Sequence, residues 1–216
     1  MLLNRAFISS FALFVLTFLS WNSTATANPQ VYLTASEELA DKILSTARSV
    51  RELPNIEDRA RSIGELLPRY MDLPTLAAHS LGRFARDYRD NRELMTRFTE
   101  ALRASLAKRL AANLTSSYSL ASFTRPNRAV AFADGIVHVR IRQSGESGIQ
   151  GTLVFMPSAD GSRMVLSDLQ AANMSMSLAY RTQHIEFLSR NGNHLEGLIQ
   201  SHISSAAQNQ PSRNGF

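Results

Sequence analysis

The sequence predicts an α+β fold in which several helices pack on one face of a four-stranded antiparallel meander sheet. Apolar residues recur with a helical period of about 3.6 up to about residue 117, and with a strand period of about 2 after Pro126. The pairs Asp134-Gly135 and Asp160-Gly161 then supply the tight turns that connect neighbouring antiparallel strands. Helices therefore come first in the chain and strands follow, with two further helices at the C-terminal end.

The first 27 residues have the three parts of a cleaved secretory signal. Arg5 gives a positive start, residues 6–21 are apolar, and Ala25-Thr26-Ala27 offers a small-residue cleavage site. The apolar run is shorter than the roughly 20 residues that span a bilayer, although an uncleaved anchor stays an alternative. We therefore expect export across the inner membrane to the periplasm. A single domain over residues 28–207 and a disordered tail over 208–216 should follow.

The shorter helices are predicted from apolar periodicity and from residues that start or stop a helix. Pro54-Asn55 separates the first two helices, and Asn191-Gly192-Asn193 separates the last two. Asp72 is a predicted N-cap for a third helix that tolerates Pro74 in its first turn. The other four predicted helices cover residues 35–50, 56–69, 178–190 and 194–206.

The longest predicted helix runs from about Asn91 to about Ser117. Its apolar row repeats every four residues, and on an ideal helix such a row drifts by about 40° at each step. The two ends of the helix should therefore face different partners. The row consists of Leu94, Phe98, Leu102, Leu106, Leu110 and Leu114.

The predicted strands cover residues 129–133, 136–142, 149–156 and 163–169. In the second strand, Val137, Val139 and Ile141 share one face, and the residues between them are polar. This alternation is typical of an antiparallel sheet with one dry and one wet face.

Composition excludes several classes of chemistry. Without cysteine the chain can form no disulfide, zinc–thiolate site, cysteine nucleophile or bacterial lipid anchor on an N-terminal cysteine. The net charge is +5, but the 23 basic residues, of which only two are lysine, are scattered between acids, which argues against a nucleic-acid stripe. The five histidines are dispersed and are expected to be surface or partly buried residues, and SGESG lacks the context of a nucleophile elbow. We therefore expect no enzyme and no cofactor.

The stretch DLQAANMSMSLAYRTQHIEF raises the question of a copper site, because soft thioether ligands select Cu(I). Met174, Met176 and His184 would supply its ligands in a periplasmic metal-binding protein, which we keep as an alternative. The alternation of methionine with serine instead favours the end of a strand that turns helical at about Leu178. Both methionines would then share one face and belong to an apolar wall.

Three stretches together resemble the MlaC-like periplasmic phospholipid-shuttle family, also known as toluene-tolerance auxiliary proteins. They are LLPRYMDLPTLAAHSLGRFARDY, RELMTRFTEALRASLAKRL and DLQAANMSMSLAYRTQHIEFLSRNGNHLEGLI. The chain departs from the family pattern where Asn173 replaces a glycine, Arg109-Leu110 a tyrosine and Phe84-Ala85 a tryptophan. The family includes a hopanoid-associated branch, so a hopanoid-related lipid also stays open as cargo.

The resemblance implies a carrier that encloses phospholipid acyl chains in an apolar pocket between helices and sheet. Its partners would be an inner-membrane ABC transporter with an MCE-type subunit and an outer-membrane lipoprotein complex. An NTF2-like protein for a small polar ligand is a further alternative. The residues expected to line the apolar pocket are Leu73, Leu76, Phe84, Phe98, Leu102, Leu106, Val139, Ile141, Leu153, Phe155, Val165, Met174, Met176 and Tyr180.

Overall fold

The structure, a computed structural model, describes residues 29–115, 119–132, 134–144, 148–171 and 174–207. The predicted signal and the predicted C-terminal tail lie outside the described residues, as does Asn173. Within the described ranges, no helix combines the length and the apolar character needed to cross a membrane.

The predicted helices are present, with changes at their ends. Asn55 caps its helix by accepting a hydrogen bond from the Asp58 N–H, and Asp72 caps the next by accepting one from the Thr75 N–H, as predicted for Asp72. A short helical turn after Leu81 was not predicted, because it is too short to show a periodicity. The helices are α2 (Pro29–Arg51), α3 (Ile56–Tyr70), α4 (Leu73–Leu81), η1 (Gly82–Phe84), α5 (Ala85–Tyr88), α6 (Arg92–Asn113), η2 (Leu120–Ser122), α7 (Met176–Arg190) and α8 (Leu195–Ala207).

The sheet is antiparallel and has more strands than predicted. Its order is β1-β3-β4-β5-β6, and β2 also pairs with β3. The prediction of four strands is therefore wrong, because the described part of the chain contains six. Strand β1 was not predicted, and β6 corresponds to the strand end predicted at the methionine stretch, which the count of four left out; both have only two residues. The strands are β1 (Phe123–Thr124), β2 (Val130–Ala131), β3 (Val137–Gln143), β4 (Gln150–Pro157), β5 (Met164–Ala171) and β6 (Met174–Ser175).

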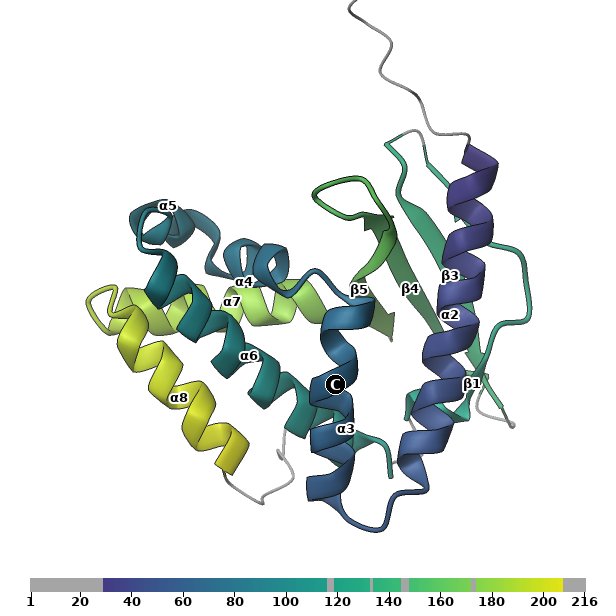
Figure 1. Cartoon of the computed structure of the whole chain (residues 1–216), viewed down its shortest axis with the longest axis horizontal. Helices are drawn as coiled ribbons and strands as arrows, with labels where there is room; N and C mark the ends of the chain where they lie inside the picture. The colour runs from purple at the N-terminus through teal and green to yellow at the C-terminus, as the bar shows by residue number, and fades with distance from the viewer. Residues whose placement is uncertain (1–28, 116–118, 133, 145–147, 172–173, 208–216) are drawn as a thin grey trace, which may run out of the picture.

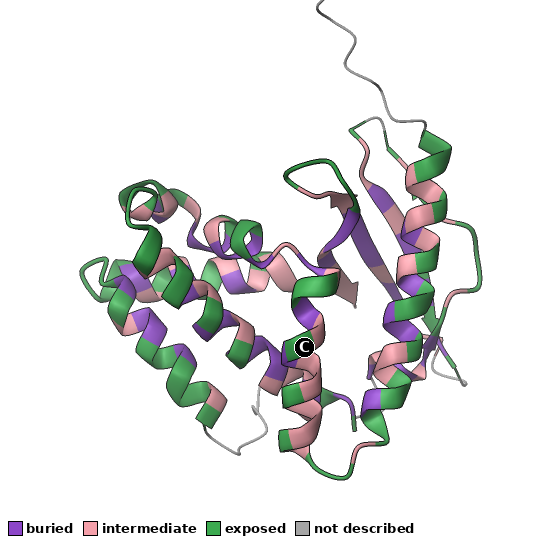
Figure 2. Ribbon diagram, in the orientation of Figure 1, coloured by how far each residue is buried: buried purple, intermediate pink, exposed green. Residues whose placement is uncertain are grey.

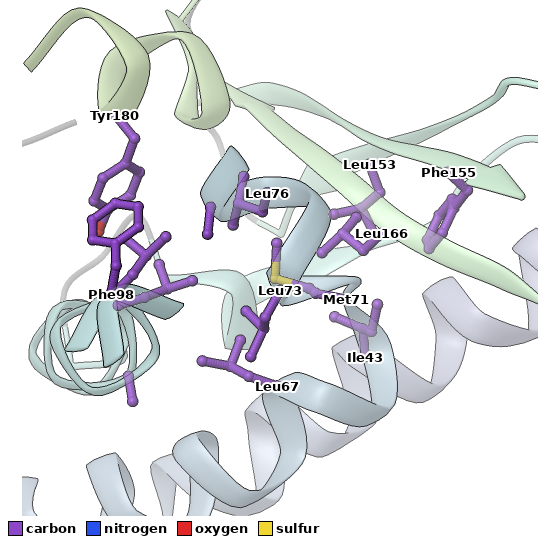
Figure 3. Packing of buried hydrophobic residues seen from close by; sticks show 14 of the residues in the cluster. Ile43, Leu67, Met71, Leu73, Leu76, Phe98, Leu153, Phe155, Leu166 and Tyr180 are labelled. Atoms are coloured by element: carbon purple, nitrogen blue, oxygen red, sulfur yellow. The ribbon is translucent and has the colours of Figure 1, made fainter. Parts of the chain in front are cut away.

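The core lies where the helices meet the dry side of the sheet. Helix α2 runs along the sheet, whereas α4, α6, α7 and α8 gather on the other side of the view with α3 between them (Figure 1). Buried residues concentrate on the surfaces that these elements turn toward one another (Figure 2). Side chains from both groups converge on one interior (Figure 3). They include Ile43, Leu67, Met71, Leu73, Leu76, Phe98, Leu153, Phe155, Leu166 and Tyr180.

Helix α6 confirms the prediction that its two ends face different partners. Phe98, Leu102 and Leu106 are buried in the main core, where Phe98 contacts the ring of His184 at 5.5 Å between centroids. Leu114, at the end of the same row, instead packs with Val50 and Ala121 in a separate small cluster. The drift of the four-residue spacing around the helix accounts for this change of partner.

Gly82 permits the close approach of η1 to α7. Its backbone has φ +56°, a conformation that side chains other than glycine rarely adopt. A Cβ atom at this position would lie 2.7 Å from Cδ1 of Ile185 on α7. The glycine in the Leu-Gly-aromatic motif is therefore required by the backbone conformation at the end of α4, and it also allows the Ile185 side chain of α7 to pack close to the backbone.

A buried chain of hydrogen bonds joins α8, α7 and α4. The Ser80 hydroxyl donates to the Ala77 carbonyl at 2.8 Å, so its oxygen accepts from Nδ1 of His184 at 2.9 Å. Nε2 of His184 is then an acceptor, and His202 Nε2–H donates a hydrogen bond to it at 3.0 Å. This His202–His184–Ser80 relay requires a neutral His184, because Nε2 of its ring must accept a hydrogen bond. His184 and His202 are 2% and 8% exposed, so the expectation of dispersed, surface or partly buried histidines is wrong for this pair.

The surroundings of the relay favour the neutral imidazoles. Burial lowers the pKa of His184 to about 3, and the neighbouring His202 and the Arg109 guanidinium add to this effect. Burial, and then Arg109, lower the pKa of His202 to about 4. The other faces of the relay are covered by the rings of Phe98 and Tyr180. A proton added to Nε2 of His184 would break the donor–acceptor order, and a proton on either ring would place a positive charge in a buried site.

The stability of the protein should fall as the pH drops below about 6.5. Both histidines bind protons more weakly in the folded than in the unfolded chain, so their full contribution is present above pH 6.5 and is lost as the pH falls toward 4. Each histidine should contribute a slope of about 1.4 kcal/mol per pH unit in this window. Urea unfolding between pH 7.5 and 5 measures the slope, before most carboxylates titrate.

Two variants separate the relay from other groups. His202→Gln should lower stability at pH 7.5 and remove about half of the slope, because one titrating group is lost. His194→Gln, which changes an exposed histidine, should leave the slope as in wild type. An unchanged slope in His202→Gln would contradict a neutral relay.

Candidate functional site

A pocket of about 310 Å³ lies between α4, the outer edge of β5 and the start of α7. Among the described strands, β6 pairs only with Gln170 and Ala171, so the earlier part of β5 has no strand beyond it on this side. The pocket occupies the place next to that free edge. It is lined by Asp72, Thr75, Leu76, His79, Met156, Val165, Leu166, Ser167, Asp168 and Ser177.

The pocket has an apolar and a polar part. Leu76, Val165 and Leu166 are buried, and Leu76 and Leu166 also belong to the main hydrophobic core. Thr75 and His79 are exposed and lie on the solvent side of α4. The apolar wall is therefore continuous with the core, whereas the rim offers hydroxyl, carboxylate and imidazole groups to a ligand.

Both helices at the pocket begin there, and each is capped by residues of the chain itself. Asp72 accepts hydrogen bonds from the Thr75 N–H at 3.1 Å and from the Thr75 hydroxyl at 2.9 Å. Ser175 caps α7 by accepting from the Leu178 N–H at 3.1 Å. The free N–H groups that make a helix N-terminus attractive to anions are thus partly satisfied within the protein.

Asp168 links the sheet to α7 at the wall of the pocket. It is 7% exposed, and one carboxylate oxygen accepts from the Ser177 N–H at 2.9 Å. The other oxygen accepts from the Gln170 side-chain amide at 3.2 Å. These bonds and the position at a helix N-terminus offset the cost of burying a carboxylate.

The structure brings most of the predicted pocket residues into one continuous core, but only two of them line the pocket. Leu76 and Val165 form part of its wall. Met176 is partly buried against the core, and Met174 is 44% exposed. The others, all buried in the main core cluster, are Leu73, Phe84, Phe98, Leu102, Leu106, Val139, Ile141, Leu153, Phe155 and Tyr180.

The methionine stretch is arranged differently from its prediction. Helix α7 begins at Met176, two residues before the predicted start at about Leu178. The Ser175 side chain caps this earlier start. Met174 and Met176 therefore do not share one face of a strand. Both ring nitrogens of His184 are engaged, one by Ser80 and one by His202, so the structure does not present His184 with the methionines as copper ligands. No group of three or more His, Asp or Glu side chains suited to a metal occurs within the described ranges.

Tyr180 and Arg109 form a second buried contact beside the relay. The Arg109 guanidinium lies 5.4 Å from the centre of the Tyr180 ring, a cation–π distance, and burial raises the pKa of the tyrosine hydroxyl. Tyr180 is 2% exposed and packs against Phe98 and His184. The contact anchors α7 to α6 and does not reach the described pocket.

Sequence reasoning missed the polar rim of the pocket. Asp72 was identified as a helix cap, but nothing in a periodicity places it beside Asp168, which lies almost a hundred residues later. No local signal links Ser177 to Asp168, because the two residues lie nine positions apart and capping signals act within the first turn of a helix.

Comparisons with known proteins agree with this architecture. The model of the MlaC protein family matches residues 37–201. No match was found among curated proteins. The fold is shared with a solved structure of a phospholipid-binding protein from Ralstonia solanacearum in complex with a phospholipid, with a TM-score of 0.63 and 18% identity over 82% of this chain and 97% of that one. Because the family model covers well over half of the sequence, the chain belongs to the MlaC family.

Proposed function

We propose that this protein is a periplasmic phospholipid-binding carrier. The observation that carries the proposal is a pocket whose apolar wall of Leu76, Val165 and Leu166 continues into the core and whose polar rim faces solvent. Membership of the MlaC family supports lipid binding, as does the shared fold with a protein solved in complex with a phospholipid. Both also support a binding or carrier role rather than an enzyme.

The pocket must enlarge to hold a whole phospholipid. Its volume of about 310 Å³ is at the lower end of the range of about 300–1,000 Å³ for drug-sized ligands, and two long acyl chains need more room. We infer that the start of α4 moves away from β5 while the Ser177–Asp168 bond keeps the start of α7 in place, and that the acyl chains enter between α4 and β5. Core residues next to the pocket, such as Leu73, Leu153 and Phe155, would then contact the lipid.

Lipid needs a carrier to cross the aqueous space between two membranes. Each methylene group exposed to water costs about 0.8 kcal/mol, so a free two-chain lipid does not cross an aqueous compartment at a useful rate. The predicted signal would direct the protein to that compartment. In this role it would receive and deliver lipid at an outer-membrane lipoprotein complex and at an inner-membrane ABC transporter with an MCE-type subunit.

Protein purified from the periplasm without detergent should contain phospholipid. The apolar wall and adjoining core would otherwise leave an enlarged cavity empty, which destabilises a protein in proportion to its volume. Solvent extraction followed by mass spectrometry, normalised to protein concentration, measures the bound lipid. Preparations that are folded and consistently free of lipid would contradict the proposal.

Filling the pocket should reduce lipid binding. In Val165→Phe the larger side chain would occupy part of the pocket, so the ratio of bound lipid to protein should fall severalfold. Overpacking should also lower stability by about 1–3 kcal/mol. The matched control is Val50→Phe, since Val50 is equally buried but lies in the small cluster with Leu114 and Ala121. Equal lipid content in the two variants at similar melting temperatures would show that the pocket is not the lipid site.

A further inference from the structure

The described pocket is acidic, although the chain as a whole is basic. The sequence has 23 Lys and Arg against 18 Asp and Glu, yet the pocket is lined by two aspartates and by no lysine or arginine. His79 is the only basic side chain of the lining. A ligand group at the rim therefore meets carboxylate charge instead of the positive charge that prevails elsewhere.

The basic residues nearest in sequence to the lining are directed elsewhere. Arg163 precedes the β5 part of the lining, but its guanidinium donates hydrogen bonds to the Arg69 and Pro68 carbonyls at the end of α3, the latter at 3.1 Å. Arg181 lies one turn after Ser177, and its side chain packs beside Gly82. Neither arginine lines the pocket, so neither offsets its carboxylates there.

The helix N-termini at the pocket do not restore an anion site. The groups that would hold a phosphate already donate to Asp72 at the start of α4, and to Asp168 and Ser175 at the start of α7. Each ionised carboxylate accepts up to about four hydrogen bonds, and the structure shows two at Asp72 and two at Asp168. The rim thus retains acceptors for a donor group and repels an anion.

We propose that this rim selects the headgroup of the cargo, favouring lipids that carry a primary ammonium over lipids with a net negative headgroup. An ammonium brings three hydrogen-bond donors and a positive charge to Asp72 and Asp168. This inference rests on the proposed lipid-binding function, which it extends from apolar chains to headgroup chemistry.

The test offers the protein both kinds of lipid at once. Wild-type protein is incubated with vesicles of equal parts phosphatidylethanolamine and phosphatidylglycerol with identical acyl chains, re-isolated, and its lipid identified by mass spectrometry. We expect the ratio of bound amine lipid to bound phosphatidylglycerol to be about two- to fivefold higher than in the vesicles, the contribution of about one partly exposed charge pair.

The charge-only variant is Asp72→Asn combined with Asp168→Asn. Asparagine caps a helix as well as aspartate does, and the Gln170 amide can turn to pair with it, so both helix starts should be retained. The variant should bind lipid in the ratio present in the vesicles. Asp90→Asn, which removes an exposed carboxylate outside the lining, should keep the enrichment of the wild type.

The outcomes separate the two proposals. Bound lipid in the vesicle ratio in wild type would overturn the headgroup inference and leave the carrier function standing, whereas no bound lipid would overturn both. Enrichment that persists in the folded double variant would also overturn the inference. If that variant does not fold, wild type decides alone: the enrichment must shrink in 1 M salt, where charges are screened within about 3 Å, and an enrichment insensitive to salt would contradict the role of the carboxylates.

Discussion

The hydrogen bond from the Ser177 N–H to the Asp168 carboxylate fixes how the sheet joins the helices. Strand β6 has only two residues, so the chain passes from β5 to α7 almost at once and needs a firm start for the helix. Asp168 supplies it from within the sheet. Tyr180 follows Ser177 by three residues and His184 follows Tyr180 by four, which places them on one side of α7. The same bond that forms the wall of the pocket therefore also aims α7 at its partners in the core.

Polar and apolar contacts stabilise different parts of the fold. Within the helical group, the relay of His202, His184 and Ser80 ties α8, α7 and α4. Separating these helices would leave buried polar groups unsatisfied, at a cost of about 1–3 kcal/mol each. Between helices and sheet, the contacts around Leu76 and Leu166 are apolar. Exchanging them for contacts with an acyl chain costs little, so in the proposed role lipid should enter between α4 and β5 and leave the helical group and the Ser177–Asp168 bond intact.

The elements that were predicted from the sequence are those with a clear apolar periodicity. Strands β3, β4 and β5 and the helices have runs long enough for the apolar pattern to be read, and Asp72 followed by Pro74 is a local signal of a helix start. The family resemblance was confirmed by the family match, although no single motif was specific.

What the sequence did not predict depends on contacts between distant segments. His184 and His202 look dispersed until α7 and α8 pack against each other, and only then do their nitrogens come within 3.0 Å. The pocket rim joins Asp72 to Asp168 by the same kind of tertiary contact. Met176 was assigned to a strand because methionine alternates with serine in this stretch. The same short segment also contains a helix cap, Ser175, and the sequence alone does not show which of the two signals prevails.

The energetics of the pocket limit its influence on which lipid is carried and in which direction. A lipid that leaves a bilayer for an apolar pocket exchanges one apolar environment for another, so the net gain from the acyl chains is small. The acidic rim adds at most a modest preference, because partly exposed charge pairs contribute only up to about 1 kcal/mol. Such a rim can bias which lipid is carried but cannot impose a direction. In the proposed role, direction must therefore come from the membrane complexes that load and unload the carrier, and weak, similar affinity at both ends is an advantage for a protein that must release its cargo.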